Sequence, residues 1–262
     1  MQEVATPVTP SAAPSPADSA VIGAATPELS VVMPVYNEAD GIADVVAEVA
    51  SVVLDRLEVA ELVLVDDAST DATPEILDRL AEADTRLRVV HAEQNGGHGP
   101  ALRRAIDESR GDWIFQMDSD GQQLPEEFWK LWERRNENDL VMGKRQINRN
   151  GRHRIAVSAG ARYVNRGLGG GDIRDVNCPF KLFRRELWED VSQHIPETPM
   201  VPSLLIAFGA ALRGWRIDQA GVTSLPRQHG SSTVNVPALL RLMTGALREV
   251  LAFRMRAPRR GR

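Results

Sequence analysis

Residues 29–35 read LSVVMPV, and the polar residues YNE follow at positions 36–38. A short run rich in β-branched and other apolar side chains is typical of a strand that is buried on both faces of a sheet. Residues 42–53 then carry apolar side chains three and four positions apart, which predicts an amphipathic helix. ELVLVDD at 61–67 predicts a second buried strand, and TPEILDRLAEAD at 73–84 predicts a second helix.

The same alternation continues through the next segments of the chain. RLRVVHA at 86–92 predicts a strand, GPALRRAIDESRG at 99–111 a helix, and DWIFQMD at 112–118 a fourth strand. Strands that alternate with helices in this way favour a mainly parallel central sheet between two layers of helices. The predicted fold class is therefore α/β with three layers, and ligands are expected at the carboxyl ends of the strands.

Polar residues follow three of these four strands at the point where each strand ends. They are Tyr36 to Glu38 after the first strand, Asp66 and Asp67 after the second, and Asp118 to Gln122 after the fourth. Because the carboxyl ends of parallel strands meet at one edge of a sheet, we expect these groups to line a common crevice.

The segment FQMDSDGQ, at 115–122, places two carboxylates one residue apart at a strand end. Unpaired, Asp118 and Asp120 would repel each other. A divalent cation removes this repulsion, and carboxylate and amide oxygens suit Mg²⁺ or Mn²⁺, with Gln122 as the third ligand. The alternative is a solvated Asp-rich turn, which the position after a fourth parallel strand makes less favourable.

Two further segments allow both a binding role and a structural role. A carboxylate of Asp66 or Asp67 can accept a hydrogen bond from a base or a ribose, while the residues at 69–71 can cap the next helix. The glycine-rich segment EQNGGHGPALRRA, at 93–105, could offer backbone N–H groups to phosphate, but it lacks the Gly-Lys-Ser/Thr spacing of a Walker loop. A plain loop remains the alternative there.

The second half of the chain carries basic groups that a diphosphate leaving group and an anionic acceptor would need. Lys144 and Arg145 follow a further short strand, and Arg154 and Ser158 lie one helical turn apart. Arg227 and His229 occupy a loop with a glycine. For any single arginine a solvated surface position is the alternative, so these residues indicate an anion site only as a set.

Composition restricts the class of protein. The chain has 262 residues, of which 43% are hydrophobic and 26% charged, and its formal net charge of −5 argues against a nucleic-acid-binding protein. A single cysteine, Cys178, excludes an intramolecular disulfide and fits a reducing compartment. No uncharged apolar run reaches the roughly 18 residues of a membrane-spanning helix, and the N-terminal residues lack the pattern of a signal peptide. We therefore expect a cytoplasmic protein.

Three regions are expected along the chain. Residues 1–27 are rich in Ala, Pro, Ser and Thr and predict a disordered tail. Residues 28–235 form the α/β domain, and residues 236–262 form a basic amphipathic helix and tail. That helix has an apolar stripe consisting of Leu239, Leu242, Met243, Ala246, Leu247, Val250 and Leu251. The stripe can lie on the inner face of an anionic membrane or pack on the domain or on a second subunit, and the sequence leaves these alternatives open.

Five segments together resemble, in chain order, the motifs of family 2 glycosyltransferases, and most of all the branch of dolichyl- and polyprenyl-phosphate mannose synthases. They are SVVMPVYNEADGI, ELVLVDDASTDAT, NGGHGPALRRAID, GDWIFQMDSDGQ and DVNCPFKLFRREL. The resemblance extends from about Leu29 to Thr233. It implies a GT-A fold and an inverting, metal-dependent transfer of a hexose from a nucleoside diphosphate sugar to polyprenyl phosphate.

The resemblance also implies roles for individual residues. Those that would line the nucleoside pocket are Pro34, Tyr36, Glu38 and Asp67, and those that would bind Mg²⁺ or Mn²⁺ are Asp118, Asp120 and Gln122. Arg145, Arg154 and Ser158 would face the acceptor phosphate, and Arg227 would bind the donor diphosphate. Asp120, Arg145 and Arg154 would act at the reaction centre. GDP-mannose is the favoured donor, followed by UDP-glucose.

The chain departs from the family pattern at two places. His98 stands where the glycine-rich motif usually has Lys, and Pro202 and Ser203 stand where many relatives have an acid that deprotonates a sugar hydroxyl. No Asp or Glu lies between Glu197 and Asp218. A phosphate monoester is already an anion and needs no base, so this absence favours a polyprenyl phosphate acceptor. Three alternatives remain: Asp172 or Asp175 acts as the base, the acceptor is a hydroxyl of a soluble molecule, or the protein only binds nucleotide sugar.

Overall fold

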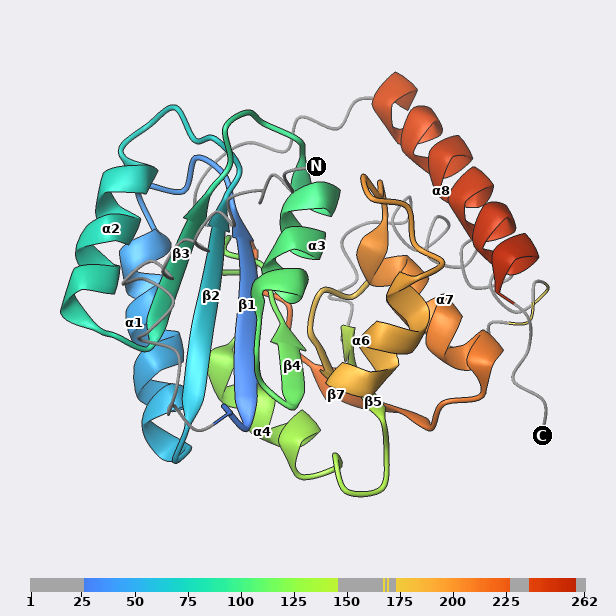
Figure 1. The fold of residues 1–262 in the computed structure, drawn as a ribbon, viewed down its shortest axis with the longest axis horizontal. Coiled ribbons are helices and arrows are strands. Elements are labelled where there is room, and N and C mark those ends of the chain that lie inside the picture. Colours follow the sequence, from blue (N-terminus) through green and yellow to red (C-terminus); the bar gives the residue numbers. More distant parts are fainter. Residues whose placement is uncertain (1–25, 146–166, 168, 170–172, 227–235, 258–262) are drawn as a thin grey trace, which may run out of the picture.

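The computed structural model describes residues 26–145, 167, 169, 173–226 and 236–257, and in the last range it describes side chains from residue 243 onward. The central feature is a seven-stranded sheet with the order β3-β2-β1-β4-β6-β5-β7 (Figure 1). The strands are β1 (Leu29–Val35), β2 (Ala60–Asp66), β3 (Leu87–His91), β4 (Trp113–Gln116), β5 (Leu140–Arg145), β6 (Lys181–Arg184) and β7 (Ile217–Val222). The predicted tail at 1–27 lies, apart from its last two residues, outside the described residues.

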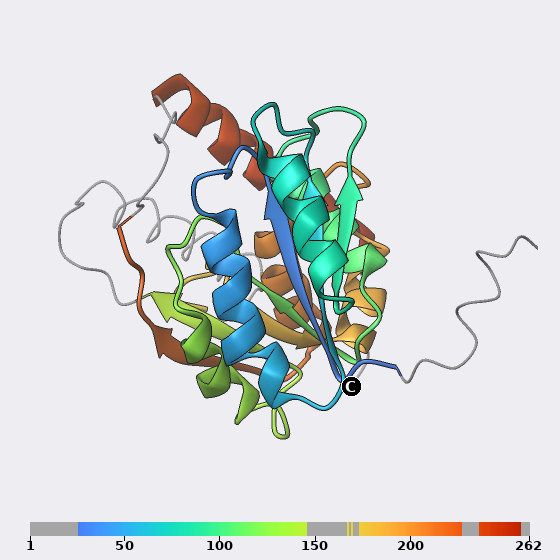
Figure 2. The same ribbon diagram turned by 90° about the vertical axis from the view of Figure 1, so that its left-hand side faces the viewer.

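Helices cover both faces of the sheet, and the three-layer α/β prediction is confirmed. They are α1 (Ile42–Val52), α2 (Thr73–Ala83), α3 (His98–Glu108), α4 (Phe128–Trp132), α6 (Arg185–Ser192), α7 (Pro202–Arg213) and α8 (Val236–Arg256), with short 3-10 turns η2 (Leu54–Arg56) and η3 (Pro125–Glu127). Helices α1, α2 and α4 share one apolar core with the sheet. Helices α3, α6 and α7 share the other core, against which α8 also packs. Figure 2 views the first of these layers, with α1 and α2 in front of the strands.

The strands are buried on both faces because their successive side chains enter different cores. In β1, Val31 and Met33 belong to the core beneath α1, whereas Val32 belongs to the core beneath α3. The strands β1 to β4 pair in parallel, as the alternation of strands and helices predicted. Their carboxyl ends therefore meet at one edge.

One strand runs against the others, and the sequence pattern did not predict it. Strand β6 lies antiparallel between β4 and β5, while β5 pairs in parallel with β7. In register, Lys181 of β6 lies opposite Gln116 of β4 and opposite Met142 of β5. Because β6 runs in the opposite direction, its amino end, and not its carboxyl end, lies beside the carboxyl end of β4.

Some apolar residues of helix α8 pack against the rest of the protein, and others are exposed. Val250 and Phe253 are buried, and the Phe253 ring lies 5.8 Å from that of Phe208 on α7. Met243 and Leu247, from the predicted stripe, are exposed. In the described part of the chain, no helix is both long enough and apolar enough to cross a membrane.

Candidate functional site

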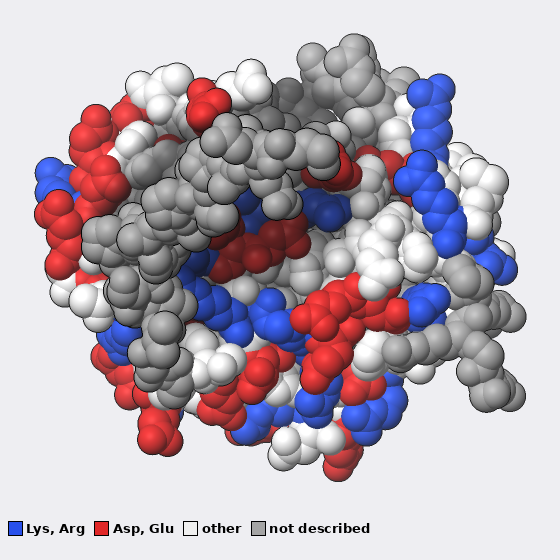
Figure 3. Space-filling view, in the orientation of Figure 1, with Lys and Arg blue, Asp and Glu red and all other residues white. Residues whose placement is uncertain are grey.

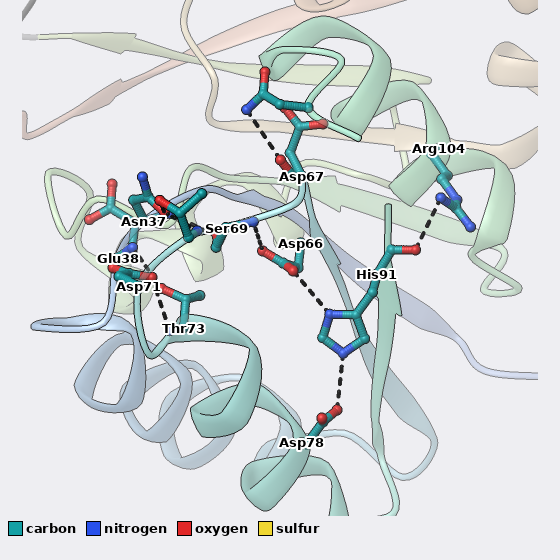
Figure 4. A network of polar contacts seen from close by, with 12 residues as sticks. Asn37, Glu38, Asp66, Asp67, Ser69, Asp71, Thr73, Asp78, His91 and Arg104 are labelled. Atoms are coloured by element: carbon teal, nitrogen blue, oxygen red, sulfur yellow. Dashed lines mark hydrogen bonds and ion pairs between the residues drawn. The ribbon is translucent and has the colours of Figure 1, made fainter. Parts of the chain in front are cut away.

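The loops after β1 and β2 are joined by hydrogen bonds between side chains of one loop and backbone groups of the other (Figure 4). Asn37 has a left-handed backbone, with φ of 52°, and its Oδ1 accepts a hydrogen bond from the N–H of Thr70 at 2.8 Å. In return, the N–H of Asn37 donates to Ser69 Oγ, and the N–H of Glu38 donates to Thr73 Oγ1, both at 2.9 Å. These bonds hold the two polar loops together at the sheet edge, as the sequence predicted.

Asp66 is 2% exposed, and each of its carboxylate oxygens has a hydrogen-bond partner. Its Oδ1 accepts from the N–H of Ser69, and its Oδ2 lies 3.0 Å from Nδ1 of His91 (Figure 4). The hydrogen bond with Asp66 raises the pKa of His91, and a second bond to Asp78 adds to this effect. Asp66 thus connects the β2 loop to β3, and its contact with a nucleoside stays a prediction.

Asp67 fixes the glycine-rich loop that leads into α3. Its two carboxylate oxygens accept hydrogen bonds from the N–H groups of Gly96 and Gly97, at 2.8 and 2.7 Å. The side chain of Asn95 also donates to the Asp67 carbonyl. Gly97 has φ of +88°, a conformation that favours glycine, immediately before α3 begins at His98. The carboxylate of Asp67 thus determines the conformation of the segment that the sequence left open as a plain loop.

The tip of β4 carries the carboxylates that the sequence predicts as metal ligands. Ser119 Oγ donates to the carbonyl of Pro34 at 3.0 Å, which ties this tip to β1. The left-handed backbone of Gly121, with φ of +66°, turns the chain. Gln122 then donates to Asp120 through both its backbone N–H, at 3.2 Å, and its side-chain amide, at 2.7 Å. Two members of the predicted trio, Asp120 and Gln122, are therefore in direct contact.

His98 at the start of α3 contacts the other carboxylate of this tip. Its Nε2 lies 3.0 Å from Asp118 Oδ1, and 53% of its side chain is exposed. Burial alone would lower the pKa of His98, but the carboxylates of Asp118, Asp120 and Asp67 raise it above its ordinary value. An imidazole with a raised pKa thus stands beside Asp118, at the position where the resembling family usually has Lys.

The donor atoms at the tip of β4 fit a hard divalent cation. In the described ranges, no three His, Cys, Asp or Glu side chains gather as a metal site by themselves. Two carboxylates with one amide oxygen leave other coordination positions for phosphate oxygens or water, as Mg²⁺ and Mn²⁺ sites that share a substrate commonly do. Asp118, Asp120 and Gln122 would be the ligands, with the amide of Gln122 rotated so that its oxygen faces the ion.

A pocket of about 270 Å³ lies on the α1 side of the tip of β4. Glu38, Ser119 and Asp120 are among the residues that line it, so one predicted nucleoside-binding residue and one predicted metal ligand share its wall. Tyr36, at the end of β1, is 45% exposed and is available to a ligand at this edge. Pro34 is buried in β1. The structure thus brings the described residues that were predicted to bind the donor to one edge of the sheet.

Arg145 at the end of β5 forms a two-point ion pair with Asp175. The Nε and Nη2 atoms of Arg145 donate to the two carboxylate oxygens at 2.8 and 2.9 Å. This hydrogen bonding raises the pKa of Arg145, and the charge of Asp118 raises it further. The carboxylate of Asp175 is thus engaged by a guanidinium, which makes it a poor candidate for the general base that the sequence left open.

Three predicted site residues, Arg154, Ser158 and Arg227, lie outside the described residues, as does Asp172. One residue that the sequence did not single out is Lys181. Its side chain is fully buried at the amino end of β6, which lies opposite Gln116 of β4 and Met142 of β5. The available signal was a lysine between Phe180 and Leu182, inside an otherwise apolar run.

Comparisons with known proteins assign this chain to a family. The family model described as Glycosyl transferase family 2 matches residues 30–192. Dodecaprenyl-phosphate galacturonate synthase of Rhizobium johnstonii is 29% identical over 234 residues, a match that covers 88% of this chain and 68% of the relative. Undecaprenyl-phosphate 4-deoxy-4-formamido-L-arabinose transferase of Pseudomonas aeruginosa is 29% identical over 223 residues, which cover 82% of this chain and 62% of the relative. This chain thus spans about two thirds of the length of each relative.

A solved structure has the same fold. Glucosyl-3-phosphoglycerate synthase from Mycobacterium tuberculosis, in complex with Mn²⁺, uridine diphosphate and phosphoglyceric acid, matches with a TM-score of 0.64 at 23% sequence identity. The match covers 86% of this chain and 78% of that one.

Proposed function

The chain belongs to glycosyl transferase family 2, and from this premise we propose that it transfers a hexose from a nucleoside diphosphate sugar to polyprenyl phosphate, with inversion at the anomeric carbon. The fold is the GT-A fold of this family, as the resemblance implied. The names of two relatives specify transfer to a polyprenyl phosphate, with different sugars. We take GDP-mannose as the first donor to test and UDP-glucose as the second.

The observation that carries the proposal is the arrangement of charge on the acceptor side. Arg145 and Lys181 are cations there, Asp175 is occupied by Arg145, and Ser203 stands in the first turn of α7 with its hydroxyl bonded to Lys181. A sugar hydroxyl would need a base at this point, whereas a phosphate oxygen needs only positive charge and positioning. This arrangement therefore favours an anionic acceptor.

The proposed reaction forms one bond and breaks one bond at the anomeric carbon. An oxygen of the acceptor phosphate attacks the anomeric carbon, and a new carbon–oxygen bond forms while the bond from that carbon to the donor diphosphate breaks. The nucleoside diphosphate leaves with the electron pair of that bond. A divalent cation held by Asp118, Asp120 and Gln122 would supply positive charge for the departing diphosphate. On the other side, Arg145 would orient the acceptor phosphate, with Asp175 fixing the guanidinium in place.

We further propose that α8 contacts the surface of the membrane that holds the lipid acceptor. An exposed stripe runs along the helix at intervals of four residues: Met243, Leu247, Leu251 and Met255. Lys and Arg side chains gather along the edge of the molecule where α8 lies (Figure 3). The single acid of the helix, Glu249, turns inward and accepts hydrogen bonds from the N–H groups of Met200 and Val201. The outer face thus combines apolar and cationic groups, as a helix on an anionic leaflet would.

The decisive experiment incubates the purified protein with labelled GDP- and UDP-sugars and Mg²⁺ or Mn²⁺, with and without polyprenyl phosphate. We expect label to enter the organic phase only when both lipid phosphate and metal are present, and the sugar nucleotide that gives this result identifies the donor. Label that remains in the aqueous phase under every condition would refute transfer to lipid. The product's anomeric configuration, compared with that of the donor, tests inversion.

A further inference from the structure

A buried polar cluster lies under the acceptor side of the site. It consists of Gln116, Lys181 and Ser203, which are 0%, 0% and 5% exposed, and we call it the floor cluster. Gln116 of β4 and Lys181 of β6 are direct partners in an antiparallel pair, so their side chains project from the same face of the sheet. Ser203, in the first turn of α7, closes the cluster, with its Oγ 2.5 Å from Lys181 Nζ.

Among the residues that the structure describes, no carboxylate forms an ion pair with Lys181. Its ammonium donates to the carbonyl of Cys178 and to Ser203 Oγ, which occupy two of its three donors. Within the part of the chain that the structure describes, no Asp or Glu lies within ion-pair distance of it. Burial lowers the pKa of Lys181 to about 8. A buried ammonium that has no ion-pair partner among the described residues is unfavourable for folding, so a lysine at this position calls for a reason other than stability.

Gln116 is a second buried polar group in an unfavourable environment. Both atoms of its side-chain amide are buried, and neither has a hydrogen-bond partner among the described residues. Buried amides are nearly always paired, and an unpaired one points to a missing ligand or water. Gln116 lies two residues before Asp118, and Lys181 lies opposite Met142, which is three residues before Arg145. The two unfavourable groups are thus adjacent to each other and to the predicted site.

We infer that the floor cluster makes the acceptor side of the site select an anionic oxygen over a neutral hydroxyl, with Lys181 as the residue that sets this preference. The inference rests on the proposed function and names the group that determines its acceptor class. Lys181 is fully buried, so it acts through its charge as a positioning residue, and does so in surroundings that screen charge weakly. Its bond to Ser203 also explains why the first turn of α7 has no acid: a carboxylate there would pair with Lys181 and could not accept a proton.

The competing explanation is structural, in which Lys181 only ties the segment containing Cys178 to α7. That explanation predicts a change in stability on substitution, with the preference for acceptors unchanged. The two explanations therefore predict different values of the KM for the acceptor when Lys181 is replaced: a change if Lys181 sets the preference, and no change if its role is structural. Folding and donor binding are measured separately.

The test compares the wild-type protein with Lys181→Met, and uses Lys130→Met as the matched control. Lys130 lies on α4, is about half exposed, and pairs with Glu127. We expect Lys181→Met to raise the KM for polyprenyl phosphate about 10-fold or more, while the KM for the donor and the affinity for the nucleoside diphosphate with Mn²⁺ change less than about 2-fold. Lys130→Met should change none of these values.

A pH profile adds a readout that a structural tie would not affect. The groups whose charges act on Lys181 are Cys178, Asp175, Arg145 and Asp118. Burial raises the pKa of the Cys178 thiol to about 11, so it stays neutral near pH 8. For the wild-type protein, kcat/KM for the acceptor should fall as the pH rises through about 8, and this decrease should be absent from Lys181→Met.

If Lys181→Met does not fold, the variant Gln116→Met tests the floor cluster instead. It replaces an unpaired amide by an apolar side chain of similar length, so the melting temperature should stay the same or rise. We expect the KM for the lipid phosphate to rise several-fold all the same. An unchanged acceptor KM in the folded variants would overturn this inference and leave the proposed function intact. A wild-type protein that transfers no sugar to lipid phosphate would overturn both.

Discussion

The donor side and the acceptor side of the site hold their charges in opposite ways. On the donor side, carboxylates are fixed by backbone N–H groups: Asp67 accepts from two glycines, and Asp71 accepts from Ala39 and Thr73. On the acceptor side, cations are fixed by side chains and by burial, as in Arg145 with Asp175 and in Lys181. The donor side therefore consists of carboxylates held by the backbone of neighbouring loops, whereas the acceptor side consists of cations held by other side chains and by burial.

The largest effect is expected at the donor side, where the proposed metal ligands lie. Asp120→Asn keeps the shape of the side chain but removes one of the two charges at the tip of β4. We expect transfer to fall about 10³-fold, because the charge of the departing diphosphate would lose its compensation. Metal-dependent binding of the nucleoside diphosphate should weaken in parallel, as calorimetry with and without Mn²⁺ would show.

Asp112→Asn is the matched control for this change. Asp112 is exposed and lies immediately before β4, at the opposite end of the same strand. Its substitution should leave transfer unchanged. Normal turnover by Asp120→Asn would contradict the assignment of Asp120 as a metal ligand.

The second prediction concerns the carboxylate that fixes the glycine-rich loop. Asp67→Ala leaves the N–H groups of Gly96 and Gly97 without their partner, in a place where the side chain was 4% exposed. We expect the free energy of unfolding to fall by about 2–4 kcal/mol, measured by urea denaturation. Asp40→Ala, at an exposed position in the neighbouring loop, should change it little. Equal stabilities of the two variants would show that the loop does not depend on Asp67.

The two sides also differ in how far the sequence could predict them. On the donor side, short apolar segments followed by polar residues predicted the parallel strands β1 to β4 and the edge at which their carboxyl ends meet. This prediction was possible because strands and helices alternate there. The sequence could not reveal that Asp67 binds two glycine N–H groups, since the turn at Gly97 depends on tertiary contacts. The fold class and the order of the first elements are thus readable from local patterns.

On the acceptor side, local patterns carry less information. Strand β6 is antiparallel, so the alternation of strands and helices does not predict it. Lys181 within it pairs with Gln116, which lies 65 positions earlier in the chain. A lysine in an apolar segment does not show by itself whether it is buried or exposed. The roles of Arg154, Ser158 and Arg227 stay predictions.

The third prediction uses pH to test the burial of Lys181 in the absence of substrate. Its folded-state pKa of about 8 lies below the ordinary value of 10.5, so between these values the folded protein binds fewer protons than the unfolded chain. Stability should therefore rise with pH in this window, by up to about 3 kcal/mol relative to Lys181→Met. The raised pKa of Cys178 acts in the opposite direction, but Cys178 is present in both proteins and its effect largely cancels in the comparison. Urea denaturation at pH 7.5, 9 and 10.5 measures the difference, and parallel curves for the two proteins would contradict a buried ammonium.

The smallest effect is expected at α8, which extends the acceptor side to the membrane surface. Arg248 and Arg256 are exposed on this helix, and each cation near an anionic surface contributes about 1 kcal/mol. The double change Arg248→Gln/Arg256→Gln should therefore weaken binding to vesicles that contain an anionic lipid by about 30-fold, and should not affect transfer to a detergent-dispersed lipid phosphate. Arg79→Gln/Arg110→Gln removes the same charge from exposed positions on α2 and after α3, and should leave vesicle binding unchanged. If both pairs weakened binding equally, the attraction would come from the net charge of the protein, and α8 would have no special part in it.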